Sequence, residues 1–162
     1  MVRRVERQQG MSLVEILVAL ALVAIISSSA YFGLNQFNRY QNLRTSYENL
    51  KNTISEAKTN AQSQVSRRCT RIQTLVGHQI RINSVTNPDS YNLEEVCLNL
   101  NSTESTYVIK TLNVTSDITL SGASNPILFL VLTGNVRNPG SITLTNNIQS
   151  KSITVNSTGI IQ

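Results

Sequence analysis

Few side chains in this sequence have the type and spacing that catalysis needs. His78 is the only histidine, and it follows Gly77 at the start of an alternating segment, where a surface or capping role is expected. The acidic residues of the head are scattered over expected loops and strands, with no spacing that indicates a metal site or a paired acid and base. They are Glu94, Glu95, Glu104 and Asp117. We therefore expect no catalytic residue, no cofactor and no metal.

Cys69 and Cys97 are the only cysteines, and their spacing is not that of a C-x-x-C motif. A zinc site would need His78 and a carboxylate as further ligands. If this part of the chain is exported, a disulfide is the favoured interpretation. It would restrict the unfolded chain by about 3–4 kcal/mol in the loop-entropy model. Two buried, unbridged thiols are the alternative.

Arg67, Arg68 and Arg71, followed by Arg81, form the basic cluster of the sequence after its first ten residues. Such a cluster could hold nucleic-acid phosphates, although surface arginines are more often simply solvated. No aromatic residues that could stack on bases are interleaved among them. Three arginines and one glutamate in the first ten residues contribute +2 of the formal charge of +5. Because the remainder is only mildly basic, DNA is the less favoured partner.

Residues 16–34 contain no charged side chain and follow the basic residues Arg3, Arg4 and Arg7. As a helix, these 19 residues would extend about 28 Å, close to the roughly 30 Å hydrocarbon thickness of a bilayer. The positive-inside rule then places the N-terminus in the cytoplasm and the remainder of the chain outside. The run therefore predicts a single-pass segment in the cytoplasmic membrane.

Two ordinary targeting signals could also account for the apolar run. Ser28-Ser29-Ala30 offers the small residues that signal peptidase prefers after an apolar core, and an uncleaved signal anchor is equally consistent. Neither explains Glu15, a carboxylate near the start of the run, where insertion costs about 2–3 kcal/mol. The remaining alternative is that Glu15 lies shallow enough to reach the lipid headgroups.

The residues around Glu15 favour a different signal. Gly10-Met11-Ser12-Leu13-Val14-Glu15 resembles the class III signal of type IV prepilins and pseudopilins, with Met11 in place of the usual Phe. The resemblance implies cleavage between Gly10 and Met11 and N-methylation of Met11. It also implies that the Glu15 carboxylate pairs with the Met11 amine of a neighbouring subunit, since two charges that are costly to bury singly become tolerable together.

This resemblance implies a structural protein, which is the substrate of an enzyme and not an enzyme itself. The expected role is a subunit, minor in abundance, of a type IV pilus or of a type II secretion pseudopilus. The expected partners are other pilin or pseudopilin subunits, a prepilin peptidase and methyltransferase, an inner-membrane assembly platform, and membrane lipid before assembly. The alternative is a membrane-tethered DNA-uptake receptor or a tip adhesin of the same filament system.

The helix is predicted to continue beyond the apolar run, from about residue 11 to about residue 64. Apolar residues recur there every three or four positions, namely Tyr40, Leu43, Tyr47, Leu50, Ile54, Ala57, Ala61 and Val65. Charged residues between them form a solvated face, namely Arg44, Glu48, Lys51, Glu56 and Lys58. We expect this stripe to hold a sheet.

From residue 73 onward the apolar period changes to two, which predicts antiparallel strands at 79–82, 107–109, 141–144 and 152–155. Turns are expected at 87–89, 133–135 and 146–147. A type II turn at 138–141 is expected to join the apolar run 127–136 to the strand 141–145 as a hairpin.

The expected fold class is α+β and pilin-like, with one long N-terminal helix packed on an antiparallel β-sheet head. The expected segments are a cleaved leader over residues 1–10, a transmembrane and assembly helix over 11–34, its amphipathic continuation over 35–66, and the head over 67–162. The order of strands near the C-terminus looks like that of the GspH/FimT group of minor pilins. DNA-binding members carry arginine after the final glycine, whereas Gly159 is followed here by Ile160 and Ile161.

Overall fold

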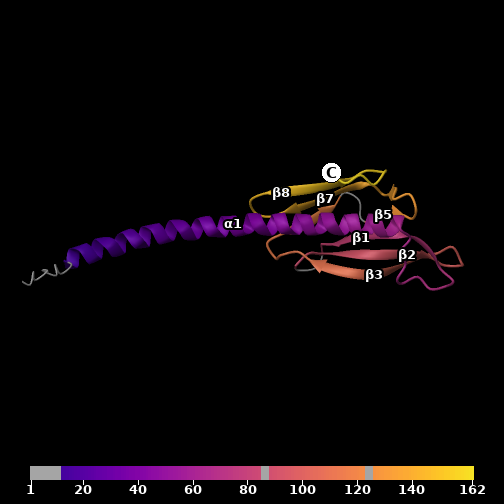
Figure 1. Ribbon diagram of the computed structural model, residues 1–162, viewed down its shortest axis with the longest axis horizontal. Coiled ribbons are helices and arrows are strands. Elements are labelled where there is room, and N and C mark those ends of the chain that lie inside the picture. Colours follow the sequence, from indigo (N-terminus) through magenta and orange to yellow (C-terminus); the bar gives the residue numbers. More distant parts are fainter. Residues whose placement is uncertain (1–11, 85–87, 123–125) are drawn as a thin grey trace, which may run out of the picture. The chain divides into compact units, whose positions relative to one another are not determined.

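The computed structural model describes residues 12–84, 88–122 and 126–162, and it divides the chain into two compact units, Met1–Asn38 and Arg39–Gln162. The described elements are shown in Figure 1. They are α1 (Leu13–Gln62), β1 (Thr74–Asn83), β2 (Ser90–Leu98), β3 (Glu104–Asn113), β4 (Thr119–Gly122), β5 (Ile127–Leu130), β6 (Val136–Arg137), β7 (Gly140–Thr145) and β8 (Ser150–Val155). A helix followed by antiparallel strands confirms the predicted α+β, pilin-like fold class.

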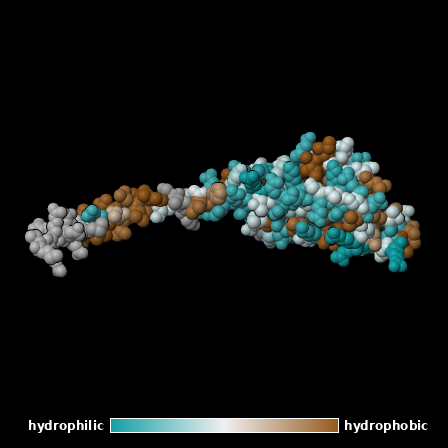
Figure 2. All heavy atoms as spheres, viewed as in Figure 1, coloured by the Kyte–Doolittle hydropathy of each residue, from teal (hydrophilic) through white to brown (hydrophobic). Residues whose placement is uncertain are grey.

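From Leu13 to Ile26, the part of α1 in the first unit is apolar except for Glu15, and the face seen in Figure 2 is largely hydrophobic there. Its large aliphatic side chains between Leu13 and Ile26 are all at least 47% exposed. A helix that is apolar all round is stable only when membrane or protein surrounds it. Within the described residues, no helix is both long and apolar enough to cross a membrane. The predicted transmembrane segment over residues 16–34 is therefore not confirmed.

The part of α1 in the second unit buries the predicted apolar stripe. Five of its residues are completely buried, namely Leu43, Leu50, Ile54, Ala57 and Ala61. Tyr47 packs against the same cluster, whereas Tyr40 is 40% exposed. Spacing of three and four residues places these side chains on one face of the helix, so the core must lie on that face.

The strands form two antiparallel sheets. The five-stranded sheet has the order β3-β2-β1-β5-β6 and the three-stranded sheet has the order β4-β7-β8. Residues of both sheets join α1 in one core cluster, including Ile80 and Leu93 from the first sheet and Ile142 and Ile153 from the second. The four predicted strands all lie inside β1, β3, β7 and β8.

The predicted hairpin between residues 127–136 and 141–145 is wrong. β5 pairs with β6 within the five-stranded sheet, whereas β7 pairs with β4 and β8 in the other sheet. The turn before β7 therefore carries the chain from one sheet to the other. Asn138, not Gly140, has the positive φ, at 63°. A local turn signal shows where the chain bends but not which strand it pairs with afterwards.

Two of the predicted turns are confirmed, and each closes a hairpin. Gly134, with a φ of 67°, lies between β5 and β6, where Leu130 N–H donates to the Asn135 carbonyl. Asn146 lies between β7 and β8, where its side-chain oxygen accepts from the N–H groups of Ile148 and Gln149. Residue 87 of the third predicted turn lies outside the described residues.

Candidate functional site

The N-terminal site is centred on Glu15. Gly10 and Met11 lie outside the described residues, which begin at Ser12. The Ser12 carbonyl accepts from the N–H of Glu15 at 3.0 Å and so starts α1. In the first turn, the carboxylate is favoured by the helix dipole. Glu15 is exposed, and among the described residues no ion-pair partner faces it.

The residues beside Glu15 make its surroundings apolar. Val18, Ala19 and Leu22 follow at helical spacing and line an open groove together with Glu15. The groove offers aliphatic contact around a single carboxylate. It can therefore accept a group that is apolar over most of its surface and carries one positive charge or one hydrogen-bond donor.

A second site lies at the junction of α1 and the five-stranded sheet, where Glu95 of β2 is completely buried. Its carboxylate accepts from Ser66 Oγ at 2.6 Å and from the backbone N–H groups of Arg67, Arg68 and Cys69 at 3.0–3.3 Å. Burial opposes ionisation of Glu95, but these four donors outweigh it, so its pKa lies below its usual value. One carboxylate thus fixes four consecutive residues of the loop that follows α1.

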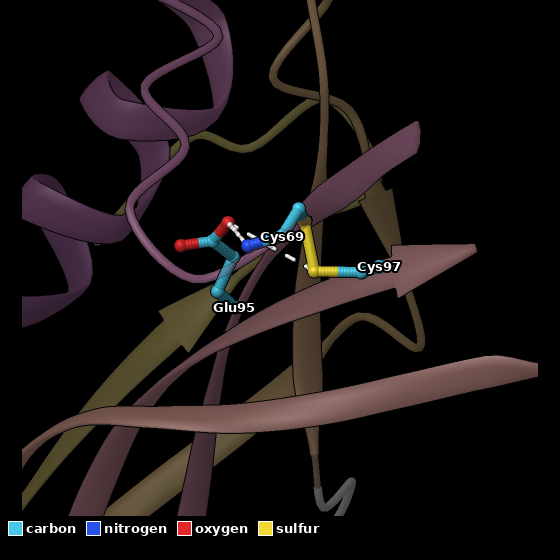
Figure 3. Close-up of side chains that lie close together, drawn as sticks. All are labelled: Cys69, Glu95 and Cys97. Atoms are coloured by element: carbon cyan, nitrogen blue, oxygen red, sulfur yellow. Dashed lines mark hydrogen bonds between the residues drawn. A yellow bond between two sulfur atoms is a disulfide. The ribbon is translucent and has the colours of Figure 1, made fainter. Parts of the chain in front are cut away.

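A disulfide between Cys69 and Cys97 closes the same junction, as predicted (Figure 3). Cys97 Sγ also lies 3.9 Å from Glu95 Oε1. The two sulfurs and the Glu95 carboxylate lie within 4.8 Å of one another, which is a spacing that could suit a metal ion. In the disulfide neither sulfur is a thiolate, and the thiolate is the form that binds metal. The proximity of these three residues is therefore explained by the disulfide, which links the loop after α1 to β2.

His78 is completely buried in β1, so its predicted surface or capping role is wrong. It lies opposite Glu95 in the pairing of β1 with β2, and neither ring nitrogen has a hydrogen-bond partner in the described structure. Burial is the main cause of a pKa below the usual value for His78. Arg67 lowers it further, while Glu95 and Glu56 act in the opposite direction. His78 is therefore neutral in the folded head at neutral pH.

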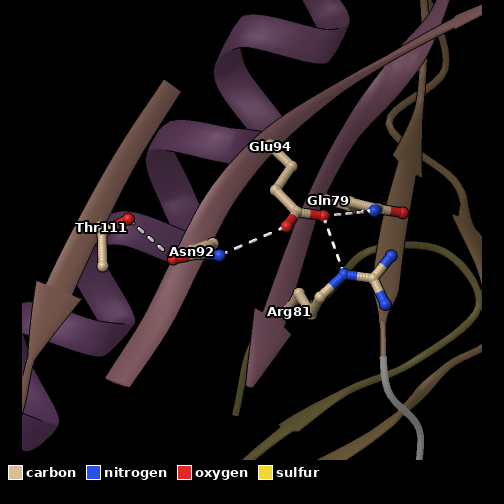
Figure 4. A network of polar contacts seen from close by, with 5 residues as sticks. All are labelled: Gln79, Arg81, Asn92, Glu94 and Thr111. Carbon is tan, nitrogen blue, oxygen red and sulfur yellow. Dashed lines mark hydrogen bonds and ion pairs between the residues drawn. The ribbon is translucent and has the colours of Figure 1, made fainter. Parts of the chain in front are cut away.

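Glu94 faces the opposite side of β2 from Glu95, since consecutive residues of a strand alternate. It accepts from Gln79 Nε2 at 2.6 Å and from Arg81 Nε at 3.0 Å, and Asn92 Nδ2 lies 3.4 Å away (Figure 4). Asn92 in turn accepts from Thr111 on β3. Glu94 and Glu95 therefore lie on a strand, which the sequence analysis allowed, but both are buried and hydrogen-bonded there.

The predicted basic cluster is divided by the fold. Arg67, Arg68 and Arg71 are exposed in the loop between α1 and β1. Arg81 lies seven residues beyond Thr74 in β1, which corresponds to about 23 Å along the strand. It is also paired with Glu94. Arg81 is therefore not part of a common phosphate site with the other three.

The N-terminal residues also match a known family. Residues 6–31 fit the family model described as the prokaryotic N-terminal methylation motif. The chain carries a type IV prepilin-like signal. The match includes Gly10, Met11 and Glu15, so the predicted resemblance is confirmed for the signal. No curated protein and no solved structure was found to match the chain.

A prepilin-like signal ahead of an α+β head supports a type IV pilin-like protein. The motif implies processing by a prepilin peptidase and assembly with other pilins. It also implies a structural rather than a catalytic role.

Six consecutive residues were enough to predict the prepilin-like signal, whereas the sequence analysis did not predict the hydrogen bonds around Glu95. Its partners lie 26 to 29 residues away in the sequence, and no local pattern relates them.

Glu95→Gln is expected to lower the free energy of unfolding of this pilin-like head by about 1–3 kcal/mol at pH 7. The physical reason is that a neutral amide leaves buried N–H donors poorly paired. Because the folded pKa of Glu95 is depressed, its contribution is complete above its usual value of 4.5 and is lost as the pH falls through the folded value. Urea unfolding as a function of pH measures both effects.

The matched control is Glu104→Gln, which removes an exposed carboxylate paired with Arg137. It should change the stability by no more than about 0.5 kcal/mol. The difference between the wild type and Glu95→Gln should shrink below pH 4.5. A difference that is independent of pH would mean that the Glu95 charge does not hold the loop.

Proposed function

We propose that this protein is a minor subunit of a type IV pilus or of a type II secretion pseudopilus. A prepilin peptidase cleaves it between Gly10 and Met11, the new amine is N-methylated, and the N-terminal part of α1 assembles it into the filament. The observation that carries this proposal is Glu15, a lone exposed carboxylate in the first turn of a helix that is otherwise apolar on all sides up to Ile26.

Cleavage after Gly10 explains why this carboxylate is tolerated. It removes three arginines and places a positively charged amine four residues before Glu15. When subunits pack side by side, the amine of one meets the carboxylate of the next in an apolar surrounding. Each charge would cost several kcal/mol to bury alone, and pairing offsets much of that cost. The pair therefore sets the register between neighbouring helices.

The apolar part of α1 also supports a membrane stage before assembly. We infer that the precursor resides in the cytoplasmic membrane with its N-terminus in the cytoplasm and its head outside, because Arg3, Arg4 and Arg7 precede the apolar run. An assembly platform of the inner membrane then moves the subunit from lipid into the filament. Both surroundings are apolar, so the helix exchanges one for the other at little cost.

Each segment of the chain has one role in this proposal. Residues 1–10 serve as the leader, 11–34 as the membrane and assembly helix, 35–66 as its amphipathic continuation, and 67–162 as the head. The Cys69–Cys97 disulfide supports a head that folds outside the cytoplasm, since disulfides persist in oxidising compartments.

The experiment is to shear filaments or pseudopili from cells and to measure how much of this subunit they contain relative to the membrane pool. We expect the subunit in the sheared fraction at a small molar ratio to the main subunit. Deletion of the prepilin peptidase should leave it in the membrane with its leader attached. Its absence from sheared fractions of cells that make filaments would refute the proposal.

A further inference from the structure

The loop after α1 ends in a β-turn that leads into β1. Gln73 N–H donates to the Thr70 carbonyl at 3.0 Å, which places Arg71 and Ile72 at the two central positions of the turn. Ile72 is 69% exposed there. The disulfide ties Cys69, directly before the turn, to β2. The tip of this turn is therefore exposed although its backbone is held in place.

A second β-turn, between β2 and β3, lies at the same end of the head (Figure 1). Ser102 N–H donates to the Asn99 carbonyl at 3.0 Å, so Leu100 takes the first central position. Leu100 is 82% exposed. The side chain of Gln73 donates to that of Asn99 at 2.6 Å and so links the two turns. Their tips are thus held side by side, each with an exposed aliphatic side chain.

Leu100 and Ile72 are the two most exposed large hydrophobic side chains among the described residues of the unit Arg39–Gln162. Removing an aliphatic side chain of this size from water strengthens binding by about 10-fold or more. The tips of turns are convex, so a protein partner would need a pocket for each side chain, and stable protein interfaces bury about 800 Å² on each partner. A lipid surface deforms around such tips and needs no matching pocket.

Positive charge surrounds these two side chains. Three exposed arginines occur within five positions of the loop, namely Arg67, Arg68 and Arg71. Other basic residues of the head also lack an ion pair, so what distinguishes the loop is the clustering of arginines beside exposed aliphatic side chains. The carboxylate of Glu95 is occupied by Ser66 and by backbone N–H groups. Glu104, after the second turn, is paired with Arg137. Neither acid pairs with a guanidinium group of the loop.

We propose that residues 67–73 and 99–102, here called the double-turn tip, dock on the surface of an anionic phospholipid bilayer. Ile72 and Leu100 enter the boundary between headgroups and acyl chains, and the arginines bind the headgroup phosphates. Interfacial binding of this kind grows with the buried apolar area and with attraction to anionic lipid, and the tip supplies both. DNA would use the arginines alone and leave both aliphatic side chains in water. The contact is separate from the proposed role of α1 in the membrane and filament.

The test uses a fluorescent reporter at the tip. The sequence contains no tryptophan, so Leu100→Trp introduces a single one. The full chain, kept in solution by a nonionic amphipol, is mixed with vesicles of phosphatidylcholine that contain or lack phosphatidylglycerol. Tryptophan emission should shift to shorter wavelength with the phosphatidylglycerol vesicles and stay unshifted with phosphatidylcholine alone. The apparent affinity should fall as salt is added, because salt screens the attraction between arginines and headgroups.

Each contribution has a matched control. Ile148→Trp, at a 44% exposed position between β7 and β8, should show no shift, which controls for contact of α1 with lipid. In the Leu100→Trp chain, Ile72→Ser should weaken binding about 10-fold at unchanged charge. Replacement of the three loop arginines by glutamine should weaken it about 100-fold. Removal of the same charge outside the tip, with Arg39→Gln/Arg44→Gln/Lys110→Gln, should have a much smaller effect. All of these positions are exposed, so the unfolding midpoints should not change.

Several outcomes would overturn the proposal. One is no shift of the Leu100→Trp emission with phosphatidylglycerol vesicles at low salt, or an equal shift with phosphatidylcholine alone. Another is an equal loss in the two triple glutamine variants, which would reflect net charge and not the tip. A shift that appears without vesicles as the protein concentration rises would assign the tip to a second copy of the chain. None of these results bears on the filament role, which the sheared fractions test separately.

Discussion

Glu15→Ala is expected to abolish incorporation of this subunit into filaments while leaving cleavage and folding of the head unchanged. The substitution makes the first turn of α1 more apolar and lies outside the unit Arg39–Gln162. In the filament, however, the amine of the neighbouring Met11 would be buried without a partner. Removing one member of a buried pair costs about 3–5 kcal/mol. Recovery in sheared filaments relative to the membrane pool should fall by two orders of magnitude or more.

Glu15→Gln separates charge from shape. It keeps the size and hydrogen bonding of the side chain but deletes the charge, so a similar loss would isolate the electrostatic contribution. Val18→Ala is a suitable control, since it alters the same groove without touching the charge. If both Glu15 variants entered filaments as well as the wild type, Glu15 would be a shallow acid solvated by headgroups, and the proposed register mechanism would be wrong.

Gly77→Ala is expected to destabilise the head by about 3 kcal/mol or more. A Cβ at this position would lie 1.9 Å from the carbonyl oxygen of Phe129 in β5. Gly77 follows an irregularity in the pairing of β1 with β2, and it also pairs with Leu130 of β5. The obstacle is backbone, so no side-chain rotation relieves it. Thermal unfolding followed by circular dichroism should show a midpoint lower by on the order of 10 °C.

Gly33→Ala provides the control for this substitution. A Cβ at Gly33 would meet nothing within 4 Å, and alanine favours the helix by about 1 kcal/mol over glycine. The unfolding midpoint of the head should therefore stay the same. An unchanged midpoint in Gly77→Ala would contradict the close approach of β1 and β5.

The sequence predicted those parts of the fold whose signals are local. The stripe from Leu43 to Ala61 has helical spacing, and burial of that stripe follows from the spacing alone. Alternation identified segments of β1, β3, β7 and β8 in the same way. The prepilin-like signal also lies within a few consecutive residues.

The missed features depend on contacts between distant segments. β2 contains the adjacent acids Glu94 and Glu95, whose burial and partners no local pattern in the sequence predicts. One is satisfied by Gln79 and Arg81 on β1, and the other by the loop after α1. The same holds for His78, which is buried and lies opposite Glu95 in the pairing of β1 with β2.

The most direct test of the central claim is the N-terminus of the mature protein. N-terminal sequencing and intact mass of protein extracted from membranes should show a chain that begins at Met11 and is heavier by one methyl group. A chain that begins at Tyr31 would show cleavage after Ala30 by ordinary signal peptidase. A chain that still begins at Met1 in cells with active prepilin peptidase would show that the apolar run is an uncleaved signal anchor. Either result would contradict the assignment of a pilin-like subunit.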